Sequence, residues 1–100
     1  MRPPSFGRDV KTLARKLIIG RDKYFSDDSF NSEGRKVFEE LARMLVFEHP
    51  YYKKRVREVR RKGDFTTFIK LAEVILGEEE VKTLLSTTMN QPYDERRSSP

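Results

Sequence analysis

The sequence predicts an all-α protein, a compact bundle of four to five short helices with flexible N- and C-terminal tails. Apolar residues recur three and four positions apart through most of the chain, which is the spacing of one helix face. No stretch alternates apolar and polar residues convincingly, so no sheet is expected. The length of 100 residues corresponds to about one domain. We expect this domain to span residues 9–89, with flexible segments at residues 1–8 and 90–100.

The first expected helix begins near Asp9 and ends near Gly20 or Tyr24. Aspartate is a good N-cap because its side chain can accept hydrogen bonds from the free N–H groups of the first turn. Residues 25–32 are rich in Asp, Ser and Asn and are expected to form a loop that supplies caps to the next helix. The apolar residues of the first helix share one face, and its opposite face carries Lys11, Arg15 and Lys16.

The second expected helix covers residues 32–48 and has a clear register. Val46 and Phe47 lie outside its main apolar stripe, which indicates either a docking surface or a helix that the core contacts on two sides. His49 precedes Pro50, and a residue before proline is pushed out of the helical region, so the helix should end there. The apolar stripe consists of Val37, Phe38, Leu41, Met44 and Leu45.

The third expected helix, from about Tyr51 to Lys62, is strongly basic. Pro50 suits the first turn of a helix, and Gly63 is a natural residue just after its end. Its apolar stripe is narrow, so the helix should lie across the domain surface with most of its cations facing outward. The stripe holds Tyr52, Val56 and Val59, and the cations are Lys53, Lys54, Arg55, Arg57, Arg60, Arg61 and Lys62.

The last two expected helices cover residues 64–77 and 78–89. Asp64 can cap the first of them, and its apolar residues cover well over half of its circumference, as expected of the most buried helix. Gly77 separates the pair, and the second helix opens with three glutamates, which the helix dipole favours. The same glutamates argue against a helix-turn-helix, because they would meet DNA phosphates with like charge.

Charge and composition narrow the functional class. The formal net charge is +5, and residues 51–63 form the most basic block, between acidic blocks at residues 25–50 and 64–89. Asn and Gln are few, and Cys and Trp are absent, a composition similar to that of thermophile proteins. Without cysteine, disulfides and Cys-ligated metals are excluded. No apolar run predicts a membrane span or a signal peptide, so we expect a cytoplasmic protein.

The basic helix is the principal candidate site, with the backbone phosphates of DNA or RNA as the expected ligand. Tyr51 and Tyr52, or Phe47 just before them, could stack on unpaired bases. The expected function is a small nucleic-acid-associated protein that binds largely independently of sequence, for example as an accessory subunit of a replication, transcription or ribonucleoprotein complex. The candidate phosphate ligands are the seven cations of the basic helix, assisted by Lys11, Arg15 and Lys16.

Two alternatives remain open for the basic helix. It could dock on the acidic surface of a partner protein, in an adaptor whose off-stripe apolar residues bury against that partner. It could also be a solvated face whose cations meet the acidic blocks of the neighbouring helices. A larger protein complex or a homo-oligomer is compatible with either binding role, and no membrane partner is expected.

Catalysis and metal binding find no support in the sequence. His49 is the single histidine, and no nucleophile or metal-site motif occurs. Residues 27–33 alternate oxygen-bearing side chains as a calcium loop does, but Ser32 and Phe38 stand where that loop needs Gly and Glu. We therefore expect no catalytic residue, metal, cofactor or small-molecule substrate.

Overall fold

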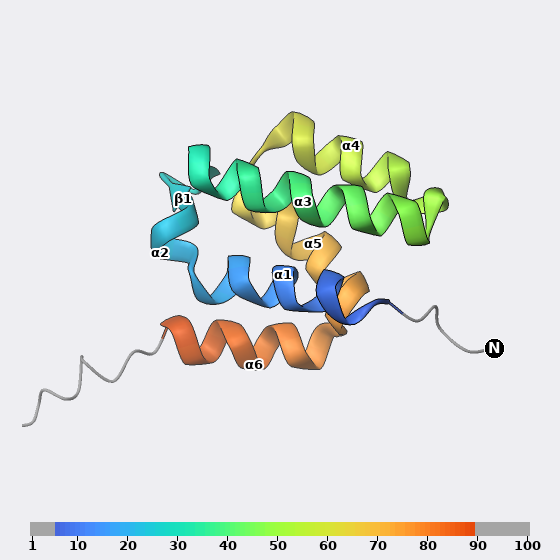
Figure 1. The fold of residues 1–100 in the computed structure, drawn as a ribbon. Helices are drawn as coiled ribbons and strands as arrows, with labels where there is room; N and C mark the ends of the chain where they lie inside the picture. Colours follow the sequence, from blue (N-terminus) through green and yellow to red (C-terminus); the bar gives the residue numbers. More distant parts are fainter. Residues whose placement is uncertain (1–5, 90–100) are drawn as a thin grey trace, which may run out of the picture.

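The computed structural model describes residues 6–89 and confirms the all-α fold class (Figure 1). The five longer helices correspond to the five expected from the sequence, and a one-turn helix and a short hairpin follow the first of them. In chain order the elements are α1 (Arg8–Ile19), α2 (Arg21–Tyr24), β1 (Phe25–Ser26), β2 (Ser29–Phe30), α3 (Ser32–Glu48), the 3-10 helix η1 (Pro50–Tyr52), α4 (Lys53–Lys62), α5 (Phe65–Leu76) and α6 (Glu78–Met89).

Of the N-terminal segment predicted to be flexible, residues 6–8 are described, and Phe6 and Gly7 contact the end of α3. Residues 1–5, like the predicted C-terminal tail at 90–100, lie outside the described residues. The Phe6 ring, however, lies 4.9 Å from the His49 ring, and the Gly7 N–H donates a 2.9 Å hydrogen bond to Glu48. Gly7, and not Asp9, is the N-cap of α1, because the helix begins one residue before Asp9.

A small antiparallel hairpin stands where the sequence predicted only a loop. Phe25 pairs with Phe30, and the turn between the strands places Asp27 and Asp28 at φ of 53° and 64°. Aspartate tolerates this left-handed region better than most residues do. The prediction of no sheet was wrong here, because two residues per strand leave no period to detect.

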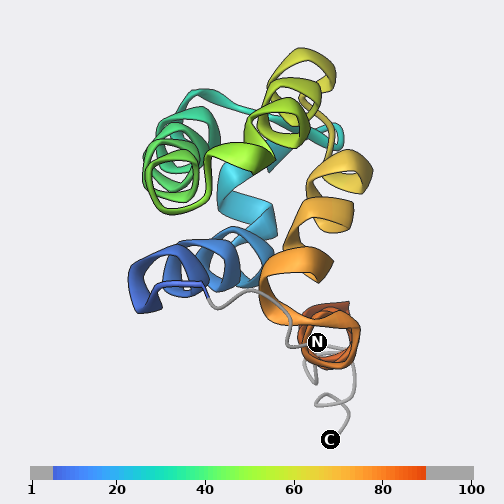
Figure 2. The same ribbon diagram turned by 90° about the vertical axis from the view of Figure 1, so that its right-hand side faces the viewer.

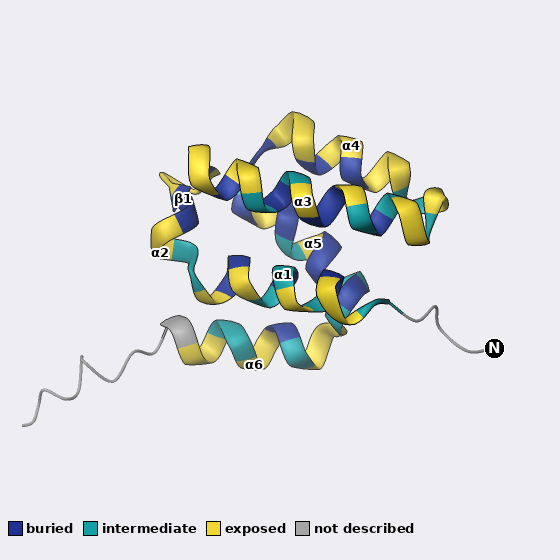
Figure 3. Ribbon diagram, in the orientation of Figure 1, coloured by how far each residue is buried: buried dark blue, intermediate teal, exposed yellow. Residues whose placement is uncertain are grey.

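The hairpin closes one end of an aromatic core. Phe25, Phe30, Phe38, Phe65 and Phe68 form a continuous network, with ring centroids 4.7 to 6.4 Å apart along its contacts. In Figure 3 the buried residues of α1, α3 and α5 face the interior, and α4 is exposed over most of its surface. Only two residues of α5 are exposed, Thr66 and Lys70, which confirms it as the most buried of the long helices.

Asp64 is the N-cap of α5, as predicted, and its carboxylate accepts a 3.1 Å hydrogen bond from the Thr67 N–H. The Thr67 side chain is the largest influence that lowers the pKa of Asp64 below its ordinary 3.8, against an opposing effect of burial. A carboxyl group whose pKa is lowered by folding stabilises the protein fully above its unfolded pKa and loses that contribution as the pH falls through the folded value.

Replacing Asp64 by alanine is therefore expected to lower the free energy of unfolding by about 1 kcal/mol at neutral pH. The Asp64→Asn variant should keep the cap, because asparagine caps helices about as well, but it cannot titrate. Denaturant unfolding of the wild type and Asp64→Asn at several pH values measures the difference. We expect the wild type to lose stability relative to Asp64→Asn only below about pH 4, and a difference that does not vary with pH would contradict the assignment.

Candidate nucleic-acid interface

The position of α4 follows from the chain break that the sequence predicted at His49–Pro50. His49 leaves the helical region, with φ of −138° and ψ of 79°, and Pro50 begins η1. The chain then reverses, and α4 returns beside α3. Val56 and Val59 are the buried residues of α4, and Gly63 ends the helix at φ of 65°. The narrow apolar stripe is thus confirmed, and the rest of α4 faces outward.

All seven cations of α4 are exposed, and one of them forms an ion pair. Arg60 donates two 2.8 Å hydrogen bonds to the carboxylate of Glu39 on α3. These hydrogen bonds are the main cause that lowers the pKa of Glu39, against the opposing effect of its burial. Within residues 6–89, no ion pair joins any other α4 cation to a carboxylate. Among the described residues, the acidic blocks therefore form one ion pair with α4, between Glu39 and Arg60.

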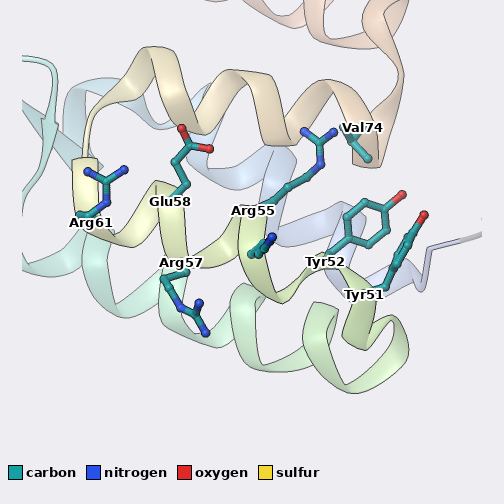
Figure 4. A pocket seen from close by; sticks show the side chains of 8 residues that line it. Tyr51, Tyr52, Arg55, Arg57, Glu58, Arg61 and Val74 are labelled. Carbon is teal, nitrogen blue, oxygen red and sulfur yellow. The ribbon is translucent and has the colours of Figure 1, made fainter.

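A basic groove of about 800 Å³ runs between α4, η1 and the end of α5. Figure 4 shows Arg55, Glu58 and Arg61 extending from α4 on the α5 side, with Tyr51 and Tyr52 closing the groove at its η1 end. Four cations and a single carboxylate border this groove, so it attracts anions. Its lining residues are Tyr51, Tyr52, Lys54, Arg55, Arg57, Glu58, Arg61 and Val74.

A second groove, of about 530 Å³, lies on the other side of α4, against α3. Arg57 borders both grooves, and in Figure 4 its guanidinium points away from the α5 side. Lys53, Arg60 and the exposed ring of Phe47 also line this second groove. Lys62 borders neither groove and lines a small hollow between α4 and α5, together with Arg55 and Lys70.

The structure separates the two tyrosines predicted to stack on bases. Tyr51 is 79% exposed. Tyr52 is half-buried, and its ring lies 5.7 Å from Phe6 and 6.1 Å from His49. Phe47, predicted as the alternative ring for stacking, is 86% exposed. Of these three rings, Phe47 and Tyr51 are therefore accessible to a ligand, and Tyr52 packs against Tyr51.

The basic residues of α1 do not extend the α4 surface. Figures 1 and 2 place α1 and α4 on opposite sides of the bundle. Arg15 forms a 2.6 Å ion pair with Glu80 of α6, and the hydrogen bond between them lowers the pKa of Glu80 against the opposing effect of burial. Lys11 and Lys16 share this distant helix. The sequence could not show this separation because helix order in space depends on packing.

Comparison of the chain with protein-family models, curated proteins and solved structures found no match. The described residues include no group of three or more His, Cys, Asp or Glu side chains that could hold a metal ion. None of the helices within residues 6–89 has the length and apolar character needed to cross a membrane. The candidate site therefore stands on its own geometry and charge.

Sequence reasoning missed two basic residues beside the α4 cations. Arg43 of α3 lines the second groove next to Arg57, and Lys70 of α5 faces Lys62 across the small hollow. In the sequence, Arg43 stood out only as the residue four positions after Glu39 on a polar face. Its spacing could not reveal that this face turns toward α4.

Proposed function

We propose that this protein binds nucleic-acid backbone phosphates through α4, largely independently of sequence. The observation that carries the proposal is the concentration of exposed cations on α4, six of which have no ion pair with a described residue, around a groove that holds one carboxylate. Lys and Arg that neutralise phosphates release the counterions condensed on the nucleic acid, which drives binding without base contacts. Membership of a larger nucleic-acid complex is compatible with this role.

Three of these cations form a row along α4. Lys54, Arg57 and Arg61 are spaced three and four residues apart, so their Cα positions share one face of the helix and span about 10 Å of its axis. All three are exposed and line the basic groove.

Fluorescence anisotropy with labelled oligonucleotides over a range of salt concentrations tests the proposal. We expect affinity to fall steeply with salt, and the variant Lys54→Gln, Arg57→Gln, Arg61→Gln to show a slope of log K against log salt that is shallower by about 2 to 3. Each lost phosphate contact removes close to one released counterion. Circular dichroism should show an unchanged fold, because none of the three side chains is buried.

The matched control removes three cations from α1 instead, as Lys11→Gln, Arg15→Gln, Lys16→Gln. It changes the net charge by the same amount on the other side of the bundle. The side chains of the ion pair that it breaks are 37% and 36% exposed, and such surface pairs contribute less than about 1 kcal/mol. We expect its salt slope to match the wild type. Equal slopes for both triple variants, or negligible binding to DNA and RNA at low salt, would refute the proposal.

One observation favours a second function, an adaptor that docks on an acidic protein. Phe47 is 86% exposed and lines the second groove together with Val46. A cationic surface with an exposed apolar ring also suits a protein partner, since aromatic and arginine residues are enriched in interfaces. Purification from the native source with nuclease treatment separates the two functions. A stoichiometric protein partner that survives nuclease favours the adaptor.

A further inference from the structure

Among the described residues, exposed aromatic rings are few and gather beside α4. The large apolar side chains exposed among the described residues are Ile19 at 58%, Phe47 at 86% and Tyr51 at 79%. Ile19 lies at the end of α1, whereas the two rings flank the turn between α3 and α4. The remaining phenylalanines are buried or partly buried in contact with the core. Two rings left open at one end of a cationic surface point to a ligand with flat apolar faces.

Both rings stand next to cations on either side of α4. Phe47, in the last turn of α3, lines the second groove with Lys53 and Arg57. Tyr51, in η1, lines the basic groove with Lys54 and Arg57. Because the chain reverses at His49 and Pro50, four residues of sequence carry the rings to the two flanks of the same helix. A ligand that crosses α4 at Arg57 can meet an aromatic ring in each groove.

The Tyr51 ring is also supported from within the protein. Its centroid lies 5.0 Å from that of Tyr52 at an interplanar angle of 72°, and Tyr52 in turn contacts Phe6 and His49. This chain of tilted rings connects the exposed tyrosine to the first described residues and to the end of α3. A ring positioned before binding loses little conformational entropy when a base stacks on it.

We infer that the ligand is single-stranded nucleic acid, whose unpaired bases stack on Phe47 and Tyr51 while Lys54, Arg57 and Arg61 contact its phosphates. The inference rests on the proposed function and narrows it to one class of ligand. In a duplex the base faces are covered by neighbouring base pairs, so exposed rings gain nothing from it. Single strands and loops present free base faces, and every base has one, so stacking adds affinity without sequence readout.

The experiment compares a labelled oligothymidylate with a duplex of equal phosphate number at fixed salt, using the full chain. We expect Phe47→Ala and Tyr51→Ala each to lower the affinity for the single strand by about fivefold or more, with no change in the salt slope. The affinity for the duplex should not change. Tyr51→Phe, which keeps the ring, should bind as the wild type does, and Ile19→Ala should be silent because it lies on α1.

Each contrary outcome has its own meaning. Equal binding of single strand and duplex, with affinity unaffected by either alanine variant, overturns the stacking inference and leaves phosphate binding standing if the salt slope is steep. Negligible binding of both nucleic acids at low salt overturns the proposed function and the inference together. Loss of a nuclease-resistant protein partner in Phe47→Ala, without any change in oligothymidylate affinity, assigns the ring to a protein interface and overturns the inference.

Discussion

Replacing Phe68 by alanine is expected to lower the free energy of unfolding by about 3 to 5 kcal/mol. The Phe68 side chain is 0% exposed and contacts four other rings, those of Phe25, Phe30, Phe38 and Phe65, at centroid distances of 6.1 to 6.4 Å. Removing the ring takes away its buried apolar surface and leaves a cavity that the hairpin, α3 and α5 can fill only partly. Urea unfolding followed by circular dichroism measures the change.

The chain supplies a matched control for this variant. Phe47→Ala makes the same chemical change at a side chain that is 86% exposed, and it should alter stability by no more than about 0.5 kcal/mol. The comparison isolates burial, because the residue lost and the residue gained are identical. A similar cost at both positions would mean that the aromatic network does not form the core, and it would place Phe47 inside the fold.

Replacing Gly34 by alanine is expected to destabilise the protein by about 3 kcal/mol, at the upper end of what overpacking costs. The added Cβ would meet the carbonyl oxygen of Tyr24 and lie 2.9 Å from its carbonyl carbon. That carbonyl also accepts a 3.0 Å hydrogen bond from the Asn31 N–H, so it cannot move away without breaking the link between α2 and α3. Thermal unfolding of the purified variant measures the loss.

The expected effect of Gly34→Ala on stability is opposite in sign to the usual effect of this substitution in a helix. In an exposed helix, replacing glycine by alanine normally stabilises by roughly 0.5 to 1 kcal/mol, because alanine has less backbone freedom to lose. Lys36→Ala, an exposed change in the same helix, should stay within about 0.5 kcal/mol of the wild type. If Gly34→Ala unfolds at the same temperature as the wild type or higher, the close approach of α2 and α3 is not as described.

The residues that stabilise the core and the residues proposed to bind nucleic acid lie in different parts of this molecule. Phe68 and Gly34 lie in the interior, whereas Lys54, Arg57 and Arg61 are exposed on α4. Variants of Lys54, Arg57 and Arg61 should therefore lose affinity for nucleic acid while keeping their free energy of unfolding. Variants of Phe68 and Gly34 should lose free energy of unfolding, and the molecules that remain folded should keep their affinity. A binding defect that is caused by misfolding can be recognised because the free energy of unfolding falls with it.

Local chemistry in the sequence predicted most of the positions where helices begin and end. The break at His49 follows from steric conflict with the proline ring, and the cap at Asp64 follows from hydrogen bonding within one turn. The hairpin at Phe25 and Phe30 was missed, because its strands are too short for a periodic pattern. Its ladder is completed by contacts across the fold, including hydrogen bonds from Phe30 to Gly63 and from Phe65 to Asp28.

The candidate site was also predicted only in part, because some of its features are local to one helix and others depend on contacts across the fold. Sequence spacing identified α4 as basic and its apolar stripe as narrow, since both follow from the geometry of one helix. It could not show that Arg60 is neutralised by Glu39, or that Arg15 is paired with Glu80 on the far side. Those pairs join residues 21 and 65 positions apart, so only the packing of helices brings them together.

The sequence by itself determined the helical class, most of the helix boundaries and a basic helix with little apolar surface, because each depends on interactions within a few residues. The tertiary structure decided which cations remain unpaired, which rings remain exposed and where α1 lies relative to α4. Burial and ion pairing between distant residues depend on how helices pack, and many packings satisfy the same periodic pattern. Phe47 shows the difference, since its sequence position only placed it off the main stripe, whereas the fold left it 86% exposed beside Arg57.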